Sequence, residues 1–239
     1  MPLTDCSEAA RIKMPRQFVV TIDGPAGAGK TTVSRRLARQ IGFDYIDTGA
    51  LYRGVAHTAL ARKVDLRSNE ALARLCKDLA IELVRRPQSA LRLIVNSVDI
   101  TDRIRTPEVT MAASAVSAQA AVRDYLLGLQ RALAHGRRAV FEGRDMGTVV
   151  FPGAEVKFFL TADLDVRARR RYLELKDQID VSLAHVRRDI ARRDTDDSQR
   201  ALAPLKAAAD ATLIDTSGLS LDALVVRLAG AVCKKIAGI

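Results

Sequence analysis

Residues 18–32 read FVVTIDGPAGAGKTT. The apolar run at 18–22, rich in β-branched residues, predicts a strand that is buried on both faces. A glycine-rich turn follows, and after it Val33, Leu37 and Ile41 recur at helical spacing, which predicts a helix over 32–41. A strand, a glycine-rich loop and a helix in this order are the setting of a P-loop. The stretch therefore indicates an α/β protein that binds a nucleoside triphosphate.

The loop satisfies the pattern G-x4-G-K-[ST] in full, from Gly24 to Thr31. Glycines let successive backbone N–H groups curl around a polyphosphate, and the positive end of the following helix adds to the attraction. We expect Lys30 to reach the β and γ phosphates and the Thr31 hydroxyl to bind Mg²⁺. The predicted ATP-binding residues are Gly24, Pro25, Ala26, Gly27, Ala28, Gly29, Lys30, Thr31 and Thr32.

The rest of the chain alternates short apolar strands with helices. Further strands are predicted at 43–46, 138–141, 156–160 and 211–214, and helices at 48–62, 69–79, 107–134, 164–176, 182–193 and 221–236. This alternation favours a parallel sheet covered by helices. Residues 80–105 differ, because their short alternating segments predict a small antiparallel meander. The expected fold class is α/β, a P-loop three-layer αβα fold with a five-stranded parallel core sheet.

The segment FEGRD at 141–145 follows a core strand. An acidic residue in this position beside a P-loop usually holds the Mg²⁺ shell, so Glu142 is the candidate. Gly143 allows a sharp turn, after which Arg144 and Asp145 project toward the carboxyl ends of the strands, where such folds bind ligands. The alternative is a solvated pair of loop residues.

Two further segments carry side chains suited to anions. In DTGALYR at 47–53, Asp47 or Thr48 caps a helix whose N-terminus, together with Arg53, suits a second phosphate. The alternatives are a plain cap and a solvated arginine. The charged segment at 192–200 suits a mobile lid whose arginines close over a transferring phosphoryl group, or else a solvated loop. Among the arginines at 167–171, contact with a donor base and solvation stay equally open.

Composition limits the class of partner. The chain has 38 basic and 28 acidic residues, a net charge of +10, which favours anionic ligands. Aromatic residues make up only 4% and tryptophan is absent, which disfavours a protein that stacks the bases of a nucleic acid. We therefore expect no nucleic-acid partner, no obligate protein partner and a monomer. The three histidines have no partner spacing and are expected to be structural.

Cysteine usage and hydropathy bear on location. The three cysteines are far apart and form no CxxC pair, which favours a reducing compartment and argues against a disulfide framework or a zinc site. No stretch approaches the ~20 apolar residues of a membrane span. Residues 1–16 lack the apolar centre of a signal peptide and are expected to form a loose extension. The expected location is the cytoplasm.

Several motifs together resemble those of the bacterial cytidylate kinases, a branch of the nucleoside monophosphate kinases. They are TIDGPAGAGKTT at 21–32, DTGALYR at 47–53, IRTPEV at 104–109, EGRDMGTVVFP at 142–152 and RRD..DS.RALAPL ending at Leu205. The resemblance covers about residues 17–236. It implies one kinase domain at 17–238, with a core at 17–50, 112–165 and 204–238, an acceptor-binding insert at about 51–111 and a lid at about 166–203.

The resemblance also implies the reaction, which is transfer of the γ-phosphoryl group of ATP or dATP to CMP or dCMP with Mg²⁺. Thr31 and Glu142 would hold the metal, partly through water. The residues implied to be catalytic are Lys30, Arg144, Arg193 and Arg200. Those implied to bind CMP are Thr48, Tyr52, Arg53, Ser114, Arg123, Arg144, Asp145, Arg193, Asp197 and Arg200. Ser114, Arg123 and Asp145 would read the cytosine edge.

Two alternatives remain at the level of sequence. One is another P-loop kinase that acts on a different nucleotide or a small metabolite. The other is a basic RNA-binding module that hydrolyses nucleoside triphosphates, against which the scarcity of aromatic residues already counts.

Overall fold

The computed structural model of the chain describes residues 15–84, 91–177 and 180–238. The expected loose extension at 1–16 therefore lies almost wholly outside the described residues. The chain divides into two compact units. Unit 1 contains the segments up to Ile46 and from Ala134 onward, and unit 2 contains Asp47–Leu133.

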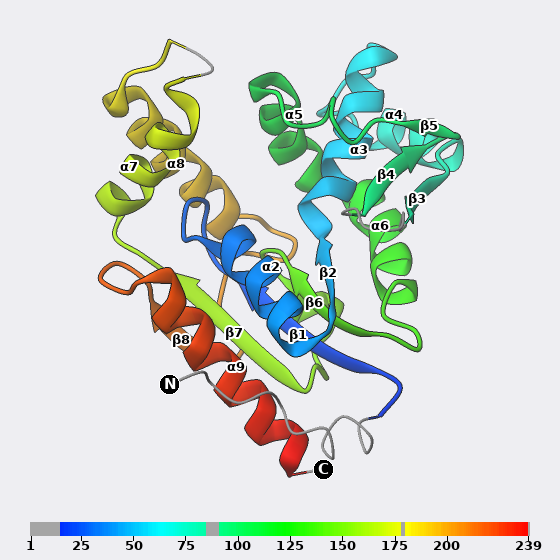
Figure 1. Cartoon of the computed structure of the whole chain (residues 1–239). Helices are drawn as coiled ribbons and strands as arrows, with labels where there is room; N and C mark the ends of the chain where they lie inside the picture. The colour runs from blue at the N-terminus through cyan, green and yellow to red at the C-terminus, as the bar shows by residue number, and fades with distance from the viewer. Residues whose placement is uncertain (1–14, 85–90, 178–179, 239) are drawn as a thin grey trace. The chain divides into compact units, whose positions relative to one another are not determined.

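Unit 1 is built on a five-stranded sheet (Figure 1) with strand order β2-β6-β1-β7-β8. The strands are β1 (Phe18–Asp23), β2 (Asp44–Asp47), β6 (Arg138–Glu142), β7 (Val156–Thr161) and β8 (Thr212–Asp215). β1 pairs in parallel with β6 on one side and β7 on the other, so that Ile22 stands opposite Glu142 and Phe158. The five-stranded parallel core sheet predicted from the sequence is confirmed.

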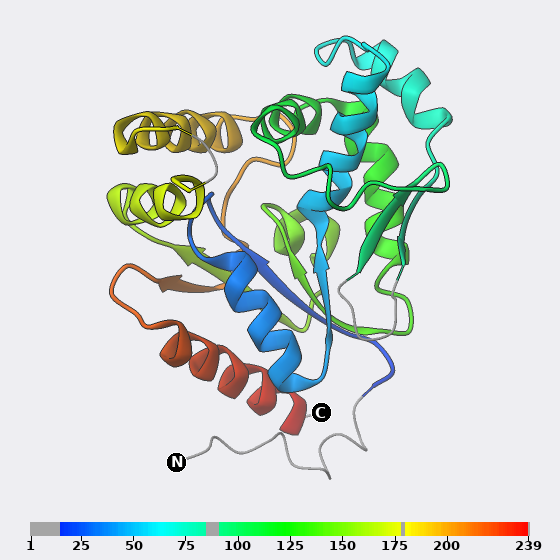
Figure 2. The ribbon, with the colours of Figure 1, turned by 45° about the horizontal axis from the view of Figure 1, so that its top comes forward.

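Helices α2 (Lys30–Ile41) and α9 (Leu221–Ala237) lie side by side against this sheet, as Figures 1 and 2 show. Their apolar faces join the strands in one core that includes Phe18, Leu37 and Leu228. β1 is buried along its whole length, including Thr21 and Asp23 in its otherwise apolar sequence FVVTID. Because β1 is central and buried, it gives the loop that follows it a rigid base.

Helices α7 (Leu164–Leu175) and α8 (Leu183–Ser198) form a separate pair in unit 1 (Figure 2). They pack around Ala168, Val186 and Ile190. The predicted end of the second helix at 193 is wrong, because α8 continues to Ser198 and makes most of the charged segment at 192–200 helical. Val186 and Ile190 anchor one face of α8 on α7, which lets a highly charged sequence stay helical beyond its apolar part.

Unit 2 combines four helices with the predicted meander. The helices are α3 (Thr48–Ala61), α4 (Asn69–Lys77), α5 (Pro107–Ser117) and α6 (Ala120–Ala132), and the strands are β3 (Ile81–Val84), β4 (Arg92–Val95) and β5 (Val98–Asp99). The strands pair antiparallel in the order β3-β4-β5, which confirms the meander, although residues 85–90 lie outside the described residues. Their core includes Leu51, Leu72, Leu93 and Leu126.

The predicted helix at 107–134 is two helices, α5 and α6, which are separated at Ala118 and Gln119. Of the cysteines within the described residues, Cys76 is a buried free thiol and Cys233 is disulfide-bonded. Within the described part of the chain, no helix has both the length and the apolar character needed to cross a membrane.

Candidate active site

The loop between β1 and α2 has the backbone of a phosphate-binding turn. Gly24, Gly27 and Gly29 have φ values of 144°, 77° and 84°, which side chains of L-residues rarely allow. At Gly24 there is also no room, since an added Cβ would lie 2.0 Å from the carbonyl oxygen of Leu160. α2 begins at Lys30, so Lys30 and Thr31 stand in its first turn, two residues earlier than predicted.

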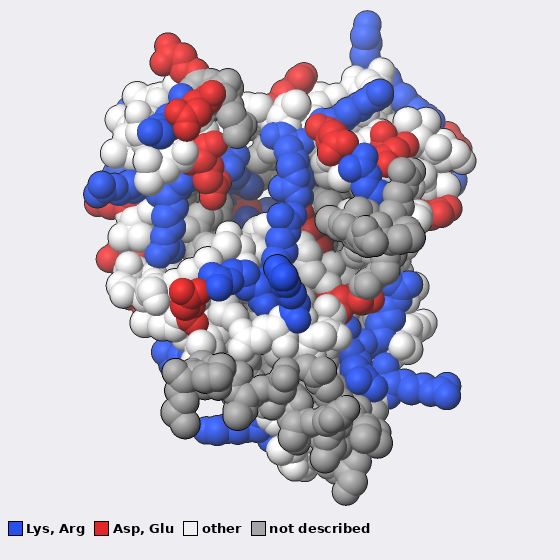
Figure 3. Space-filling model, in the orientation of Figure 1, with Lys and Arg blue, Asp and Glu red and all other residues white. Residues whose placement is uncertain are grey.

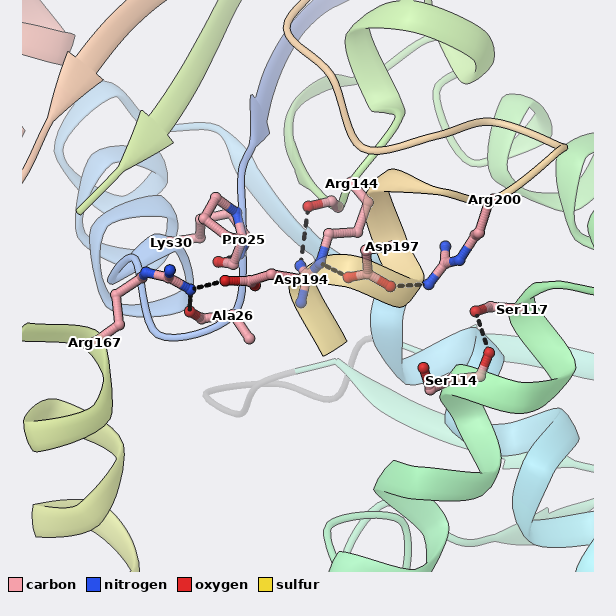
Figure 4. A network of polar contacts seen from close by, with 11 residues as sticks. Pro25, Ala26, Lys30, Ser114, Ser117, Arg144, Arg167, Asp194, Asp197 and Arg200 are labelled. Carbon is pink, nitrogen blue, oxygen red and sulfur yellow. Dashed lines mark hydrogen bonds and ion pairs between the residues drawn. The ribbon is translucent and has the colours of Figure 1, made fainter. Parts of the chain in front are cut away.

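Three side chains donate hydrogen bonds to carbonyl groups of this loop, and Figure 4 labels two of them, Lys30 and Arg167. Lys30 Nζ donates to the Pro25 oxygen at 2.7 Å, and Arg167 Nη1 donates to the Ala26 oxygen at 3.1 Å. Thr216 Oγ1 donates to the Ala28 oxygen at 3.2 Å. With its carbonyls held in this way, the loop keeps a fixed shape, as binding a polyphosphate through backbone N–H groups requires.

Lys30 is 5% exposed. Burial, and next the positive charge of Arg144, lower the pKa of Lys30 from 10.5 to about 7. Glu142 and Asp23 act in the opposite direction. An anion placed beside this amine would favour its charged form. The buried lysine is therefore an anion site by its electrostatics as well as by its motif.

Thr31 and Glu142 are brought together from α2 and the end of β6. Thr31 Oγ1 donates to Glu142 Oε1 at 2.7 Å, and the Tyr45 hydroxyl donates to Glu142 Oε2 at 2.6 Å. A hydroxyl and a carboxylate side by side at the start of the P-loop helix are the oxygen donors that Mg²⁺ prefers. Among the described residues no group of three or more His, Cys, Asp or Glu side chains could hold a metal. Magnesium here would thus also need oxygens from its nucleotide.

A second cationic cluster centres on Asp197 of α8, which is 3% exposed. Arg144 Nε donates to Asp197 Oδ2 at 3.0 Å, and Arg200 Nη2 donates to its other oxygen. Arg193 stands one turn earlier on α8. Four of the predicted site residues, Arg144, Arg193, Asp197 and Arg200, thus belong to one region of unit 1, which Figure 4 shows in part. Two arginines converging on one carboxylate make a strongly positive environment with fixed geometry.

Among the arginines at 167–171, Arg167 is buried, and contact with a donor base stays a prediction. Besides Ala26, its guanidinium contacts Asp194 of α8 at 2.6 Å, so it links the P-loop to that helix (Figure 4). Arg170 donates to Thr216, and Arg171 pairs with Glu174 on the surface. Arg167 therefore belongs to the loop network directly and Arg170 belongs to it through Thr216. The alternative of a wholly solvated face is wrong for Arg167.

Asp23, the last residue of β1, is not among the predicted site residues. Its carboxylate accepts hydrogen bonds from the backbone N–H groups of Met146, at 2.9 Å, and Gly147, at 2.8 Å. It is 3% exposed, and burial is the main cause that raises its pKa from 3.8 to about 6. An acidic residue at the end of an otherwise apolar strand was the available signal, because such a group needs a specific partner.

In unit 2, Asp47 rather than Thr48 caps α3, accepting from the Ala50 N–H at 3.2 Å. Thr48 is buried in the first turn. Arg53, one turn later, pairs with Asp47 at 2.7 Å, and Arg105 lies 3.4 Å from the same carboxylate oxygen. The helix start therefore does gather two arginines, of which Arg105 was not predicted although it belongs to the quoted segment IRTPEV.

The predicted base-reading residues of unit 2 lie on α5 and α6. Ser117 Oγ donates to the Ser114 carbonyl at 2.8 Å, and Arg123 Nη1 donates to the Ser117 carbonyl at 3.1 Å. The Arg123 guanidinium also lies over the Tyr52 ring, 5.9 Å from its centroid. Unit 2 thus brings Tyr52, Ser114 and Arg123 into one neighbourhood, with Ser117 as an added member.

A parallel sheet with a P-loop, a buried lysine in it and paired arginines beyond it defines the class of P-loop phosphotransferases. The family model described as cytidylate kinase matches residues 20–234. The chain therefore belongs to the cytidylate kinase family. This membership does not favour the small-metabolite kinase or the RNA-binding module.

Curated relatives are similar in sequence to this chain along nearly its whole length. The chain is 48% identical to the cytidylate kinase of Geobacter sulfurreducens over 214 residues, covering 89% of this chain and 91% of the relative. It is 45% identical to that of Geobacillus kaustophilus, covering 93% and 100%. A crystal structure of an uncharacterized protein from Eubacterium ventriosum has a similar fold, with a TM-score of 0.50 at 11% identity over 93% of this chain and 100% of that one.

Proposed function

We propose that the chain transfers the γ-phosphoryl group of ATP to CMP or dCMP, giving ADP and CDP or dCDP, in pyrimidine nucleotide metabolism. The observation that carries the proposal is the pairing of two cationic centres in unit 1. One is the P-loop with Lys30, and the other is the cluster of Arg144, Asp197 and Arg200. Its relatives are named cytidylate kinases, and a kinase with an anionic acceptor needs both centres.

The chemistry requires little beyond alignment and neutralisation of charge. An acceptor phosphate is already a nucleophile, so no general base is needed. Lys30 would hold the β and γ phosphates of the donor, while Arg144, Arg193 and Arg200 would neutralise the acceptor phosphate and the group in transfer. Loss of one such aligned arginine is expected to cost about 2–4 kcal/mol of transition-state stabilisation.

Magnesium is part of the proposal. Thr31 and Glu142 would hold it, partly through water, because their oxygens already lie 2.7 Å apart at the start of α2. When bound, the ion would offset the negative charge of the donor phosphates. Tyr45 keeps the Glu142 carboxylate in orientation through its own hydrogen bond.

The remaining predicted residues receive roles as acceptor ligands. Thr48 and Arg53 are assigned to the acceptor phosphate, and Asp197 to the acceptor sugar. Ser114, Arg123 and Asp145 are assigned to the cytosine edge, with Tyr52 beside Arg123. In terms of domains, the proposal keeps an acceptor-binding insert at about 51–111 and a lid at about 166–203, of which α7 and α8 form most. We further propose that the enzyme works in the cytoplasm, where its proposed substrates are metabolised. We also propose that it is a monomer.

Specificity should follow from the buried carboxylate of Asp145, which is 3% exposed. It would accept a hydrogen bond from the amino group of cytosine. Uracil has a carbonyl in that position, which would leave a buried carboxylate facing an acceptor. The enzyme should therefore prefer CMP strongly over UMP.

The deciding experiment is an assay of ADP release with CMP, dCMP, UMP, AMP, GMP and shikimate as acceptors. We expect turnover with CMP and dCMP and at least tenfold lower kcat/KM with UMP, which corresponds to about 1.4 kcal/mol. Equal turnover of CMP and UMP would contradict the base-reading role of Asp145. Turnover of shikimate in place of CMP would contradict the proposed reaction.

A second test separates the donor site from the acceptor site. Lys30→Ala should abolish transfer while leaving the equilibrium binding of CMP largely intact, because Lys30 is assigned to the donor phosphates. Arg171→Ala removes an exposed cation that pairs with Glu174, and it serves as the matched control with unchanged kinetics. If Lys30→Ala kept full activity, the assignment of the P-loop would be wrong.

A further inference from the structure

Within unit 1, Asp23 connects the P-loop to the segment that carries Arg144 and Asp145. It is the last residue of β1, directly before Gly24, the first glycine of the P-loop. Its carboxylate binds the backbone N–H groups of Met146 and Gly147, which lie 123 and 124 residues away in the sequence. These two residues open the single helical turn Met146–Val150 that follows Asp145.

The turn at Met146–Val150 takes its cap from outside itself. Asp145 occupies the cap position, but its side chain makes no capping hydrogen bond. The Asp23 carboxylate takes that role, accepting from the first two N–H groups of the turn at 2.9 and 2.8 Å. A carboxylate at the start of a helical turn stabilises it as a local N-cap would.

The two residues that carry proposed acceptor contacts, Arg144 and Asp145, are held on both sides by neighbouring residues of β1. On one side the Gly143 N–H donates to the Ile22 carbonyl at 3.1 Å. On the other side Asp23 holds Met146 and Gly147. The space around this attachment is tight, since a Cβ on Gly147 would lie 3.4 Å from Asp23 Oδ2 and 3.1 Å from Thr21 Oγ1.

We propose that Asp23 is a positioning residue for the phosphoryl acceptor. By capping the turn after Asp145, it fixes the Arg144–Asp145 pair relative to the P-loop that leaves the same strand. The donor loop and the acceptor contacts then belong to one rigid piece, which is what in-line transfer between two anions requires. This inference rests on the function proposed above.

The test compares Asp23→Asn with the wild-type enzyme. Asparagine has nearly the same shape but offers one acceptor oxygen and one NH₂ donor to two N–H groups, so one of the two hydrogen bonds is lost. We expect the KM for CMP to rise about tenfold or more, the effect of one hydrogen bond to a charged group, and kcat to fall. The KM for ATP should rise less than that for CMP, because the glycine-rich loop is held by other side chains and the bound phosphates offset the attraction that Lys30 loses with the Asp23 charge.

Two further variants make the test specific. Thr21→Val is the control, because Thr21 lies in the same strand near the same turn and its buried hydroxyl has no hydrogen-bond partner among the described residues. It should leave both KM values unchanged. Gly147→Ala disturbs the same attachment from the other side, because its added methyl would lie 3.1 Å from Thr21 Oγ1 and 3.2 Å from the Lys157 side chain. It should raise the KM for CMP without changing that for ATP.

The result that supports the inference and the results that overturn it differ in which KM values change. A role that is only structural would lower the active fraction, so kcat would fall in Asp23→Asn with both KM values unchanged, and the inference would be overturned. A parallel rise of both KM values would overturn it as well. Binding titrations of CMP and ATP on the folded fraction give the same comparison if a variant is unstable. A wild-type enzyme that leaves CMP unphosphorylated would overturn the proposed function itself, and this inference with it.

Discussion

Asp23 and Lys30 are buried charged groups at the two ends of one loop, and their partners explain why they are tolerated. Burial alone would cost each several kcal/mol. Asp23 offsets part of this cost with two backbone N–H groups, and each group lies in the field of the other. Their placement thus serves alignment at the expense of stability, as is common at active sites.

The free-energy cost of burying the Asp23 carboxylate should make the free energy of unfolding depend on pH. Its pKa is raised from 3.8 to about 6, so its contribution to stability is full below pH 4 and is lost as the pH rises through 6. The asparagine in Asp23→Asn cannot ionise, so the variant does not lose this contribution to stability as the pH rises. The free energy of unfolding of the variant minus that of the wild type should therefore increase by about 2 kcal/mol between pH 4 and pH 7. Urea unfolding across this range measures it, and a constant difference would show that burial does not raise this pKa.

The residues that could be predicted from the sequence are those whose roles depend on local spacing. The glycines, Lys30 and Thr31 are fixed by an eight-residue pattern and its flanking strand and helix. The pattern carried no information about Tyr45, which reaches Glu142 across 97 residues, or about the partners of Asp23. These contacts depend on which strands are neighbours in the sheet, and periodicity does not encode strand order.

At the level of elements, helix ends were harder to predict than helix existence. Apolar periodicity located α2, α3 and α9, but it missed the extension of α8 because the residues after Arg193 contain no apolar position. Side-chain caps explain several of the true starts. Ser68, Thr106, Ser182 and Ser220 each accept a hydrogen bond from the backbone N–H three residues on.

Asp47 combines a cap with ion pairs, and two substitutions separate these contributions. Asp47→Ala loses the bond from Ala50 and both arginine contacts, and should lower the free energy of unfolding by about 1 kcal/mol or slightly more. Asp47→Asn keeps a capping oxygen and should lose only a few tenths of a kcal/mol. Ser68→Ala, a cap on α4 supplied by a neutral hydroxyl, is the control expected to cost about 1 kcal/mol.

The measurement is urea unfolding of the three variants beside the wild type. If Asp47→Asn were as destabilising as Asp47→Ala, the ion pairs rather than the cap would hold the start of α3. Activity adds a separate readout, since Asp47 orients Arg53, which is assigned to the acceptor phosphate.

Across the whole molecule, the net charge of +10 comes from 38 basic and 28 acidic residues. Figure 3 shows basic side chains over α2, whose outward positions include Arg35, Arg36 and Arg39. Several exposed arginines lie beside acidic partners. Arg36 is 2.6 Å from Asp222, Arg171 is 2.8 Å from Glu174 and Arg187 is 2.5 Å from Asp165. Such pairs weaken the attraction that an extended polyanion would feel.

This distribution predicts how the molecule responds to RNA. Without interleaved aromatic side chains to stack bases, any association with single-stranded RNA should be electrostatic only. Such binding falls steeply with salt, so complexes detected at ~50 mM salt should largely disappear by ~200 mM. ATP consumption in the absence of CMP should not change when RNA is added, because no acceptor phosphate enters the cluster at Asp197. Saturable stimulation of ATP hydrolysis by RNA at the higher salt concentration would show that the basic surface has a role of its own, and would revive the RNA-binding alternative.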